Sequence, residues 1–242
     1  MSHLKINKHI SAQFNAELEQ AMNQVMAMGG LVEKQLIDGT RAINTSDKVL
    51  AQKVIDQDAL VNQMEVDIND LCITVIAKRQ PTASDLRLLI VVIKTISELE
   101  RVGDIARRAC KIALNPSAHS EQFKPIQVSL DSLAKRAIEL FHQVLDSFAR
   151  MDLAEAVRLY KENDRIEQEH EAIARQLMTY MMEDPRSIPE VLAFQKSAKS
   201  LEKIGARCQN ICEYIAYFVK GEDVRHKGEE AMNVLIEDMD EG

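Results

Sequence analysis

Two carboxylates one helical turn apart are the residues of this sequence best suited to chemistry. Glu100 and Asp104 are four positions apart in the segment 98–110, which predicts a helix, so both side chains project from one helical face. An apolar seam follows the same helix at intervals of four and three residues, formed by Val92, Ile96, Leu99, Gly103, Ala106 and Cys110. An oxygen-rich pair therefore lies beside a packing face.

The preceding predicted helix carries a matching polar row. Asp58, Asn62 and Glu65 recur at spacings of four and three beside an apolar seam. Oxygen ligands from facing helices are how helical bundles build metal sites, and Mg²⁺, Mn²⁺ and iron accept such ligands. These three residues, with Glu100 and Asp104, are therefore candidate ligands of a divalent cation.

A solvated acidic face is the alternative explanation of the same residues. Arg101, Arg107 and Arg108 lie three or four positions from Asp104 and can pair with its carboxylate along the helix. Charged residues make up 28% of the chain, so such pairs also arise by chance. Spacing alone leaves both interpretations open.

The helical segment around Glu100 returns later in the chain. In residues 201–208, Glu202 aligns with Glu100 and Gly205 aligns with Gly103. Glu202 is therefore the candidate ligand of the second copy. The repetition predicts that the chain contains one module twice.

The composition favours long helices over sheets. The 242 residues are 46% hydrophobic but only 4% aromatic, with 8 Gly, 5 Pro and no Trp. Apolar periodicity and helix-ending signals predict six helices, at about 10–43, 50–75, 85–114, 128–148, 152–183 and 188–219. Gly29 and Gly30 interrupt the first, which predicts a kink or a close approach of another element.

Short connections make neighbouring helices antiparallel. We therefore expect an all-α fold of two tandem antiparallel three-helix bundles related by an internal repeat. The loop-like stretch 115–120 separates a first repeat, 1–115, from a second, 121–221, and residues 222–242 form a polar acidic tail.

Charge and motif content exclude several functions. A net charge of −8 disfavours nucleic acid as a partner. The longest apolar run, 86–93, is far shorter than the ~20 residues that cross a bilayer, and we expect neither a signal peptide nor membrane insertion. Four cysteines within helical patterns indicate reduced thiols and a cytoplasmic location. No catalytic motif is evident, so we do not expect an enzyme.

Longer segments of the chain resemble the PhoU family. They are INKHISAQFN (6–15), QVMAMGG (24–30), AKRQPTASDLR (77–87), LERVGD (99–104), QLMTYMMED (176–184) and CQNICE (208–213). The resemblance implies two three-helix repeats, a cytoplasmic location and homodimers. It also implies a negative regulator of the phosphate regulon, an adaptor between the ATPase of the phosphate-specific ABC transporter and a membrane sensor histidine kinase.

The resemblance also bears on the metal site. Some PhoU proteins bind metal clusters through E(D)xxxD motifs, which Glu100 and Asp104 match. The second repeat of the family commonly reads ERIGD, but Ala206 stands here in place of the Asp, and Asn62 stands where an acid is often found. We therefore expect at most one site, in the first repeat, with weak Mg²⁺ or Mn²⁺ binding. A regulator of this kind requires no cofactor; a metal-binding helical protein that uses inter-helix carboxylates is the alternative function.

Overall fold

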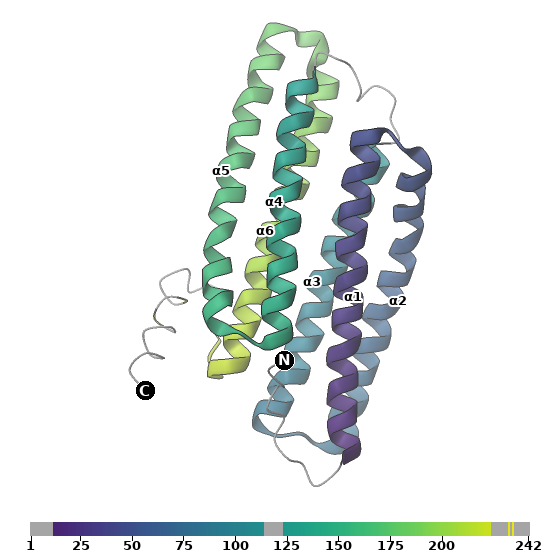
Figure 1. The fold of residues 1–242 in the computed structure, drawn as a ribbon, viewed down its shortest axis with the longest axis vertical. Helices are drawn as coiled ribbons and strands as arrows, with labels where there is room; N and C mark the ends of the chain where they lie inside the picture. Colours follow the sequence, from purple (N-terminus) through teal and green to yellow (C-terminus); the bar gives the residue numbers. More distant parts are fainter. Residues whose placement is uncertain (1–11, 114–122, 224–231, 233, 235–242) are drawn as a thin grey trace.

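The described part of the chain forms a bundle of six long helices. The computed structural model describes residues 12–113, 123–223, 232 and 234, and these contain no strand (Figure 1). The elements are α1 (Ala12–Thr45), α2 (Lys48–Arg79), α3 (Ala83–Ala113), α4 (Lys124–Arg150), α5 (Leu153–Glu183), the short 3-10 helix η3 (Pro185–Ser187) and α6 (Ile188–Lys220). The loop expected at 115–120 and most of the tail expected at 222–242 lie outside the described residues.

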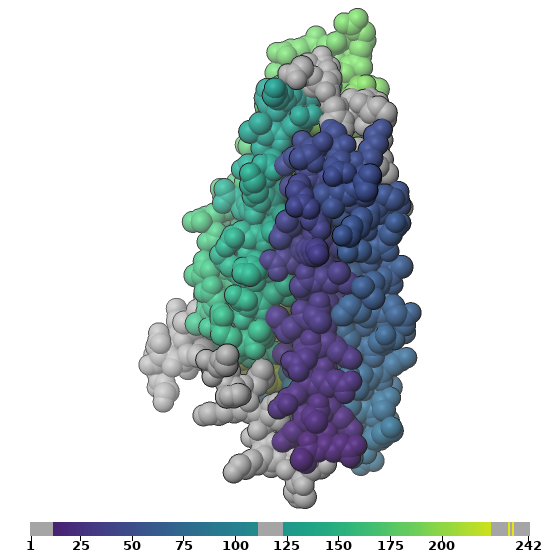
Figure 2. All heavy atoms as spheres, turned by 45° about the vertical axis from the view of Figure 1, so that its right-hand side comes forward, coloured from purple at the N-terminus to yellow at the C-terminus, as the bar shows by residue number. Residues whose placement is uncertain are grey.

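The helices form two sets of three. Helices α1, α2 and α3 pack against one another, and α4, α5 and α6 do the same. The two sets lie side by side, with α3 against α6 and α1 against α4 (Figure 1). The space-filling view shows them as one continuous surface (Figure 2). The predicted all-α fold of paired three-helix bundles is confirmed.

Apolar burial holds both sets together. One connected cluster of buried apolar side chains extends through both halves; Leu18 and Leu89 represent it in the first half, and Phe141 and Ile204 in the second. Burial of this kind is the main favourable contribution to folding.

No helix among the described residues combines the length and apolar character that a bilayer span needs.

Equivalent aspartates begin the second helix of each set. Asp47 accepts hydrogen bonds from the backbone N–H groups of Val49 and Leu50, and Asp152 accepts one from that of Glu155. Glu155 stands three residues after Asp152, where a capping box would let its carboxylate accept from the Asp152 backbone N–H. Here that N–H donates to the Ser147 carbonyl at 3.0 Å, and the Glu155 carboxylate accepts from the Arg158 guanidinium. The same cap at the same place in each repeat fixes where the second helix starts.

The first glycine of the Gly29–Gly30 pair marks a close approach of α1 and α4. Helix α1 is continuous through both residues. A Cβ atom on Gly29 would lie 2.8 Å from Cδ2 of Leu145 on α4, whereas a Cβ on Gly30 would meet nothing within 4 Å. Gly29 therefore allows the two halves to pack closely at this point.

Candidate functional site

A network of carboxylates and arginines joins α2 to α3. On α3, the two oxygens of Asp104 pair with the guanidinium groups of Arg107 and Arg108. Arg107 also lies 3.1 Å from Oδ2 of Asp58 on α2, as an ion pair rather than a hydrogen bond. Arg107 thus bridges Asp58 and Asp104 and positions the two helices.

Glu100 lies within the same network and is repelled by its neighbours. Burial raises the pKa of its carboxyl group above the ordinary value, and the charges of Glu65, Asp104 and Asp58 raise it further. Arg101 opposes this shift of the pKa. The structure therefore brings four of the predicted ligands close enough to interact electrostatically.

The other two predicted ligands are placed differently. Asn62 is exposed on α2. Glu202 belongs to α6 in the second set of helices, where its Oε2 lies 2.8 Å from Nζ of Lys199. Glu65, by contrast, belongs to the network between α2 and α3. The Ser97 hydroxyl on α3 donates a hydrogen bond to its Oε1 at 2.9 Å.

The donor set can be compared with what a metal ion needs. Among the residues that the structure describes, no three His, Cys, Asp or Glu side chains form a group that could hold a metal ion. Both oxygens of Asp104 are occupied by guanidinium groups, so a cation would have to displace Arg107 or Arg108. In this arrangement the carboxylates form an acidic face paired with arginines. Of the three arginines that could pair with Asp104, Arg107 and Arg108 do so.

The second repeat uses an amide where the first uses a carboxylate. Asn163 occupies the position of Asp58, is 1% exposed and donates from Nδ2 to Oε1 of Glu167 at 2.8 Å. Its Oδ1 points at Gly205, since a Cβ built on that glycine would lie 1.9 Å away. Asn163 and Ala206 thus stand where the first repeat has Asp58 and Asp104. Close packing of α5 against α6 takes the place of the charged network there.

A second polar network, centred on Glu98, crosses between the two halves. Glu98 on α3 is only 3% exposed. Its carboxylate accepts hydrogen bonds from Arg101 at 3.1 Å, from Arg207 at 3.2 Å and from the Tyr214 hydroxyl at 3.3 Å. Arg207 and Tyr214 lie on α6, so this carboxylate connects the two repeats. The spacing makes Arg101 one of three candidate partners of Asp104 and indicates no role for Glu98, whereas in the structure Arg101 donates to Glu98.

The same interface contains a lysine between aromatic rings. Nζ of Lys94, one turn before Glu98, lies 5.5 Å from the ring centre of Tyr214 and 5.3 Å from that of Tyr217. A cation at this distance from a ring face is attracted to it. Lys94 and Glu98 therefore both tie α3 to α6.

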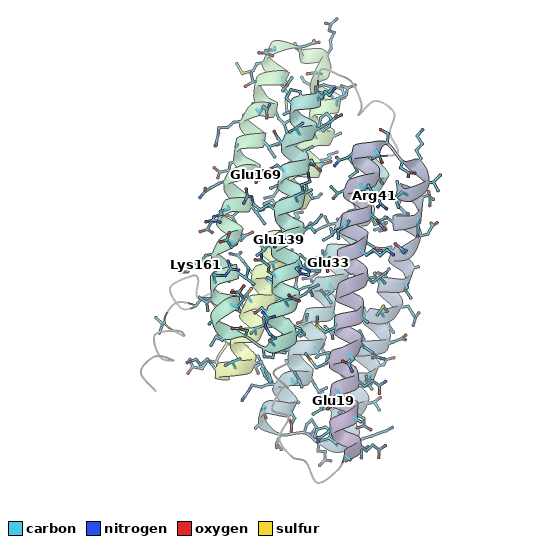
Figure 3. All side chains as sticks on the ribbon, viewed as in Figure 1. Glu19, Glu33, Arg41, Glu139, Lys161 and Glu169 are labelled. Carbon is cyan, nitrogen blue, oxygen red and sulfur yellow. The ribbon has the colours of Figure 1, made fainter. Side chains whose placement is uncertain are left out.

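A further contact joins α1 to α4. Nδ1 of His142 on α4 lies 2.9 Å from Oε1 of Glu33 on α1, and Glu33 projects between the two helices in Figure 3. Near the other end of this seam, the Asn44 amide donates to the Asp131 carboxylate. Polar contacts thus cross both inter-repeat seams.

The cysteine thiols are unsuited to nucleophilic chemistry. All four are free and buried. Burial raises the pKa of Cys72 to about 12 and that of Cys110 to about 11, and it raises the pKa values of Cys208 and Cys212 as well. Because the thiolate is the reactive form, these groups are inert near neutral pH.

Comparison with known proteins gives the family. The model of the PhoU domain matches residues 25–113 and 130–215. The phosphate-specific transport system accessory proteins PhoU of Serratia marcescens and Escherichia coli K12 are each 56% identical over 98% of this chain, and over 96% and 97% of their own lengths. The crystal structure of PhoU from Pseudomonas aeruginosa superposes with a TM-score of 0.80 at 38% identity, covering 87% of this chain and all of that one. The chain folds into paired three-helix bundles, the family model matches both of them, and relatives align over nearly its full length. This chain therefore belongs to the PhoU family.

Proposed function

We propose that this chain is an accessory regulator of a phosphate-specific transport system and that it acts by binding other proteins, not by catalysis. The observation that carries the proposal is the 56% identity, over 98% of the chain, to accessory proteins of that system. The inert cysteines and a fold built from long helices agree with a binding role.

We propose further that it is a cytoplasmic negative regulator of the phosphate regulon. In this role it connects the ATPase of the phosphate transporter to a membrane sensor histidine kinase. A regulator shifts a partner's equilibrium only when it binds two states of that partner with different affinity. Binding to the kinase should therefore be tighter in its inactive state.

The outer face of α2 supports such a binding role. Four large apolar side chains are more than half exposed on this helix: Val49, Leu60, Val66 and Ile73. Val66 and Ile73 are two turns apart and therefore lie on the same face of the helix, and exposed apolar residues that gather on one face mark surfaces that contact other proteins. We propose α2 as a partner-binding element.

A deletion strain with a phosphatase reporter tests the regulatory role. In high phosphate, the deletion should give constitutive reporter expression, and the wild-type chain should restore repression. The double variant Val66→Glu, Ile73→Glu should fold but fail to restore it. The control Gln63→Glu, Asp70→Glu alters neighbouring exposed positions of α2 and should restore it fully. A deletion strain that stays repressed contradicts the proposal.

A second copy of the chain is another partner that we propose. The same exposed apolar residues of α2 suit self-association, which also buries them. Sedimentation velocity over a range of concentrations tests this. A single species with the monomer mass of 27.3 kDa at every concentration contradicts a homodimer.

Metal binding is the alternative function, and one observation favours it. The pKa of Glu100 is raised by burial and by Glu65, Asp104 and Asp58, so a cation among these carboxylates would relieve repulsion. The oxygen donors suit Mg²⁺ or Mn²⁺. Arg107 and Arg108 compete for Asp104, which predicts weak binding.

Metal analysis after equilibration with Mn²⁺ separates this alternative from the adaptor role. Glu100→Gln and Asp104→Asn should each lower the metal content, whereas Glu19→Gln, an exposed control on α1, should not. Glu202→Gln, in the second repeat, should also leave the content unchanged. Equal metal content in all these variants contradicts a site in the first repeat.

A further inference from the structure

Two methionines on α5 expose their thioether groups to solvent. Met178 is 56% exposed and Met182 is 83% exposed, and the two are one helical turn apart near the end of α5. The other methionines in the described part of the chain are buried or half-buried. Within that part of the chain, the end of α5 is therefore where methionine sulfur meets solvent.

The pair belongs to the end of the bundle at the top of Figure 1. There α5 ends, η3 makes the turn and α6 begins, and this turn lies beyond the turn between α1 and α2 along the long axis of the molecule (Figure 1). On the α6 side of the turn, Ile188 and Leu192 are exposed large apolar side chains. Exposed apolar groups thus flank the turn on both sides.

Met181 provides a contrast within the same turn of helix. It directly precedes Met182 in the chain, yet it is half-buried and packs against the apolar core. Met28, on α1, is completely buried. A reagent in solution reaches a buried side chain only when the structure opens locally, which costs free energy. We therefore expect such a reagent to distinguish Met178 and Met182 from these two methionines.

The cysteines do not compete for an oxidant. All four are buried, and burial raises the pKa of each thiol. The thiolate is the reactive form of cysteine, so little of it is present near neutral pH. A thioether has no proton to lose, and its sulfur lone pair is nucleophilic at neutral pH. The exposed thioethers are therefore the reactive sulfur groups of the described chain.

We propose that Met178 and Met182 form a reversible oxidation site, where hydrogen peroxide converts both thioethers to sulfoxides while the bundle stays folded. In each step the sulfur lone pair attacks one peroxide oxygen, so an S–O bond forms as the O–O bond breaks. The sulfur loses two electrons and the peroxide gains them. The proton of the transferred hydroxyl passes to the departing hydroxide, which leaves as water. This site goes beyond the proposed function and does not depend on it.

Oxidation at this site changes the surface and not the core. It converts a flexible apolar side chain into a polar one. Because Met178 and Met182 are exposed, water hydrates the new oxygens and no core packing is lost. Methionine sulfoxide reductases, one for each sulfoxide epimer, restore the thioether. The level of oxidant therefore determines whether this end of the second repeat is apolar or polar.

Peptide mapping after treatment of the full chain with hydrogen peroxide tests the selectivity. Trypsin releases residues 176–186, which contain Met178, Met181 and Met182. Fragmentation of this peptide should locate oxygen at Met178 and Met182 before Met181 gains any. Met28 should react at least about tenfold more slowly than Met182, because it requires local opening. The helical circular dichroism signal and Tm should remain unchanged, and the two reductases should remove both oxygens.

Retention on a hydrophobic-interaction column tests the change of surface. Peroxide should shorten the retention of the wild type, and the double variant Met178→Gln, Met182→Gln should elute early without peroxide. Met178→Leu, Met182→Leu keeps apolar side chains of similar size, so peroxide should shift its retention much less. The matched control Met26→Leu, Met64→Leu replaces two half-buried methionines and should respond to peroxide as the wild type does.

Four results would overturn the proposal. The first is oxidation of Met181 or Met28 as fast as that of Met182. The second is formation of the sulfoxides only with loss of the helical signal, which would place the reaction in the unfolded chain. The third is sulfoxides that both reductases leave in place. The fourth is an equal shift of retention in the wild type and in the double leucine variant at 178 and 182.

Discussion

The carboxylate of Glu98 on α3 accepts a hydrogen bond from the guanidinium of Arg207 on α6 at 3.2 Å, and this contact joins the two repeats. Glu98 is 3% exposed and also accepts from Tyr214 of the same helix. Apolar seams tolerate small shifts of one helix along another, whereas a buried carboxylate is stable only where its donors meet it. The contact therefore specifies the register of α3 against α6.

Glu98→Ala should lower the free energy of unfolding by about 2–3 kcal/mol, because it leaves the half-buried Arg207 guanidinium and the buried Tyr214 hydroxyl without this acceptor. Urea denaturation measures the change. Glu171→Ala is the control: its carboxylate pairs with Arg175 where both side chains are about two-thirds exposed, and the expected loss is below about 0.5 kcal/mol. Equal losses in the two variants would argue against a role for Glu98 in register.

The helices and the repeat were predictable because they depend on local signals. Apolar periodicity is a property of each segment, and the two aspartate caps, Asp47 and Asp152, recur in aligned positions. Gly221, directly after the last residue of α6, ends that helix with a φ of +80°, and a glycine just past an apolar periodic segment is a local signal of this kind. The pairing of Arg107 and Arg108 with Asp104 was also within reach, since spacings of three and four suffice to suggest it.

The network around Glu98 was not predicted because it depends on which helix faces α3. The sequence did contain a signal. Val91, Thr95, Glu98, Val102 and Ile105 recur at intervals of four and three, and all are buried in the structure. This is a second packing stripe on α3, beside the seam that faces its own repeat. A helix with two such stripes contacts two neighbours, and a charged residue within the second one must meet a partner there.

Gly205→Ala should destabilise the protein by about 1–3 kcal/mol, the usual cost of overpacking. The added Cβ would lie 1.9 Å from Oδ1 of Asn163, which is 1% exposed and has little room to move. Thermal unfolding measures the effect. The matched control Gly30→Ala is exposed in mid-helix with nothing within 4 Å of the new atom, so it should stabilise by about 0.5–1 kcal/mol.

The double variant Asn163→Ala, Gly205→Ala sharpens this test. Removing the amide makes room for the new methyl group, so the second substitution should cost much less in this background. A cost for Gly205→Ala that does not change when Asn163 is absent would place its origin elsewhere.

Glu100→Gln should raise Tm near neutral pH and have little effect at about pH 4. The pKa of Glu100 is raised in the folded protein, by burial first and then by Glu65, Asp104 and Asp58. The folded state therefore retains the proton to higher pH than the unfolded chain does, so stability falls as pH rises from the unfolded pKa through the folded one. Gln lacks this ionisation and escapes the penalty.

A pH series of melting curves for wild type, Glu100→Gln and the exposed control Glu19→Gln measures this difference. The gain in Tm should appear only in the Glu100 variant and should grow with pH. A gain of the same size at both ends of the pH range would show that a pH-independent change in packing or hydrogen bonding, and not ionisation, determines the effect.

Asp47→Ala and Asp152→Ala should each cost about 1 kcal/mol, the typical value for removing an aspartate N-cap. Asp47 accepts from two backbone N–H groups, at 3.0 and 2.9 Å, and Asp152 accepts from one at 3.0 Å. Asp47→Asn and Asp152→Asn retain the accepting oxygen and should recover most of the loss. Urea denaturation of the four variants gives the comparison. Because the two caps occupy equivalent positions of the repeat, a large loss at one and none at the other would show that the repeats, although alike in fold, do not contribute equally to stability.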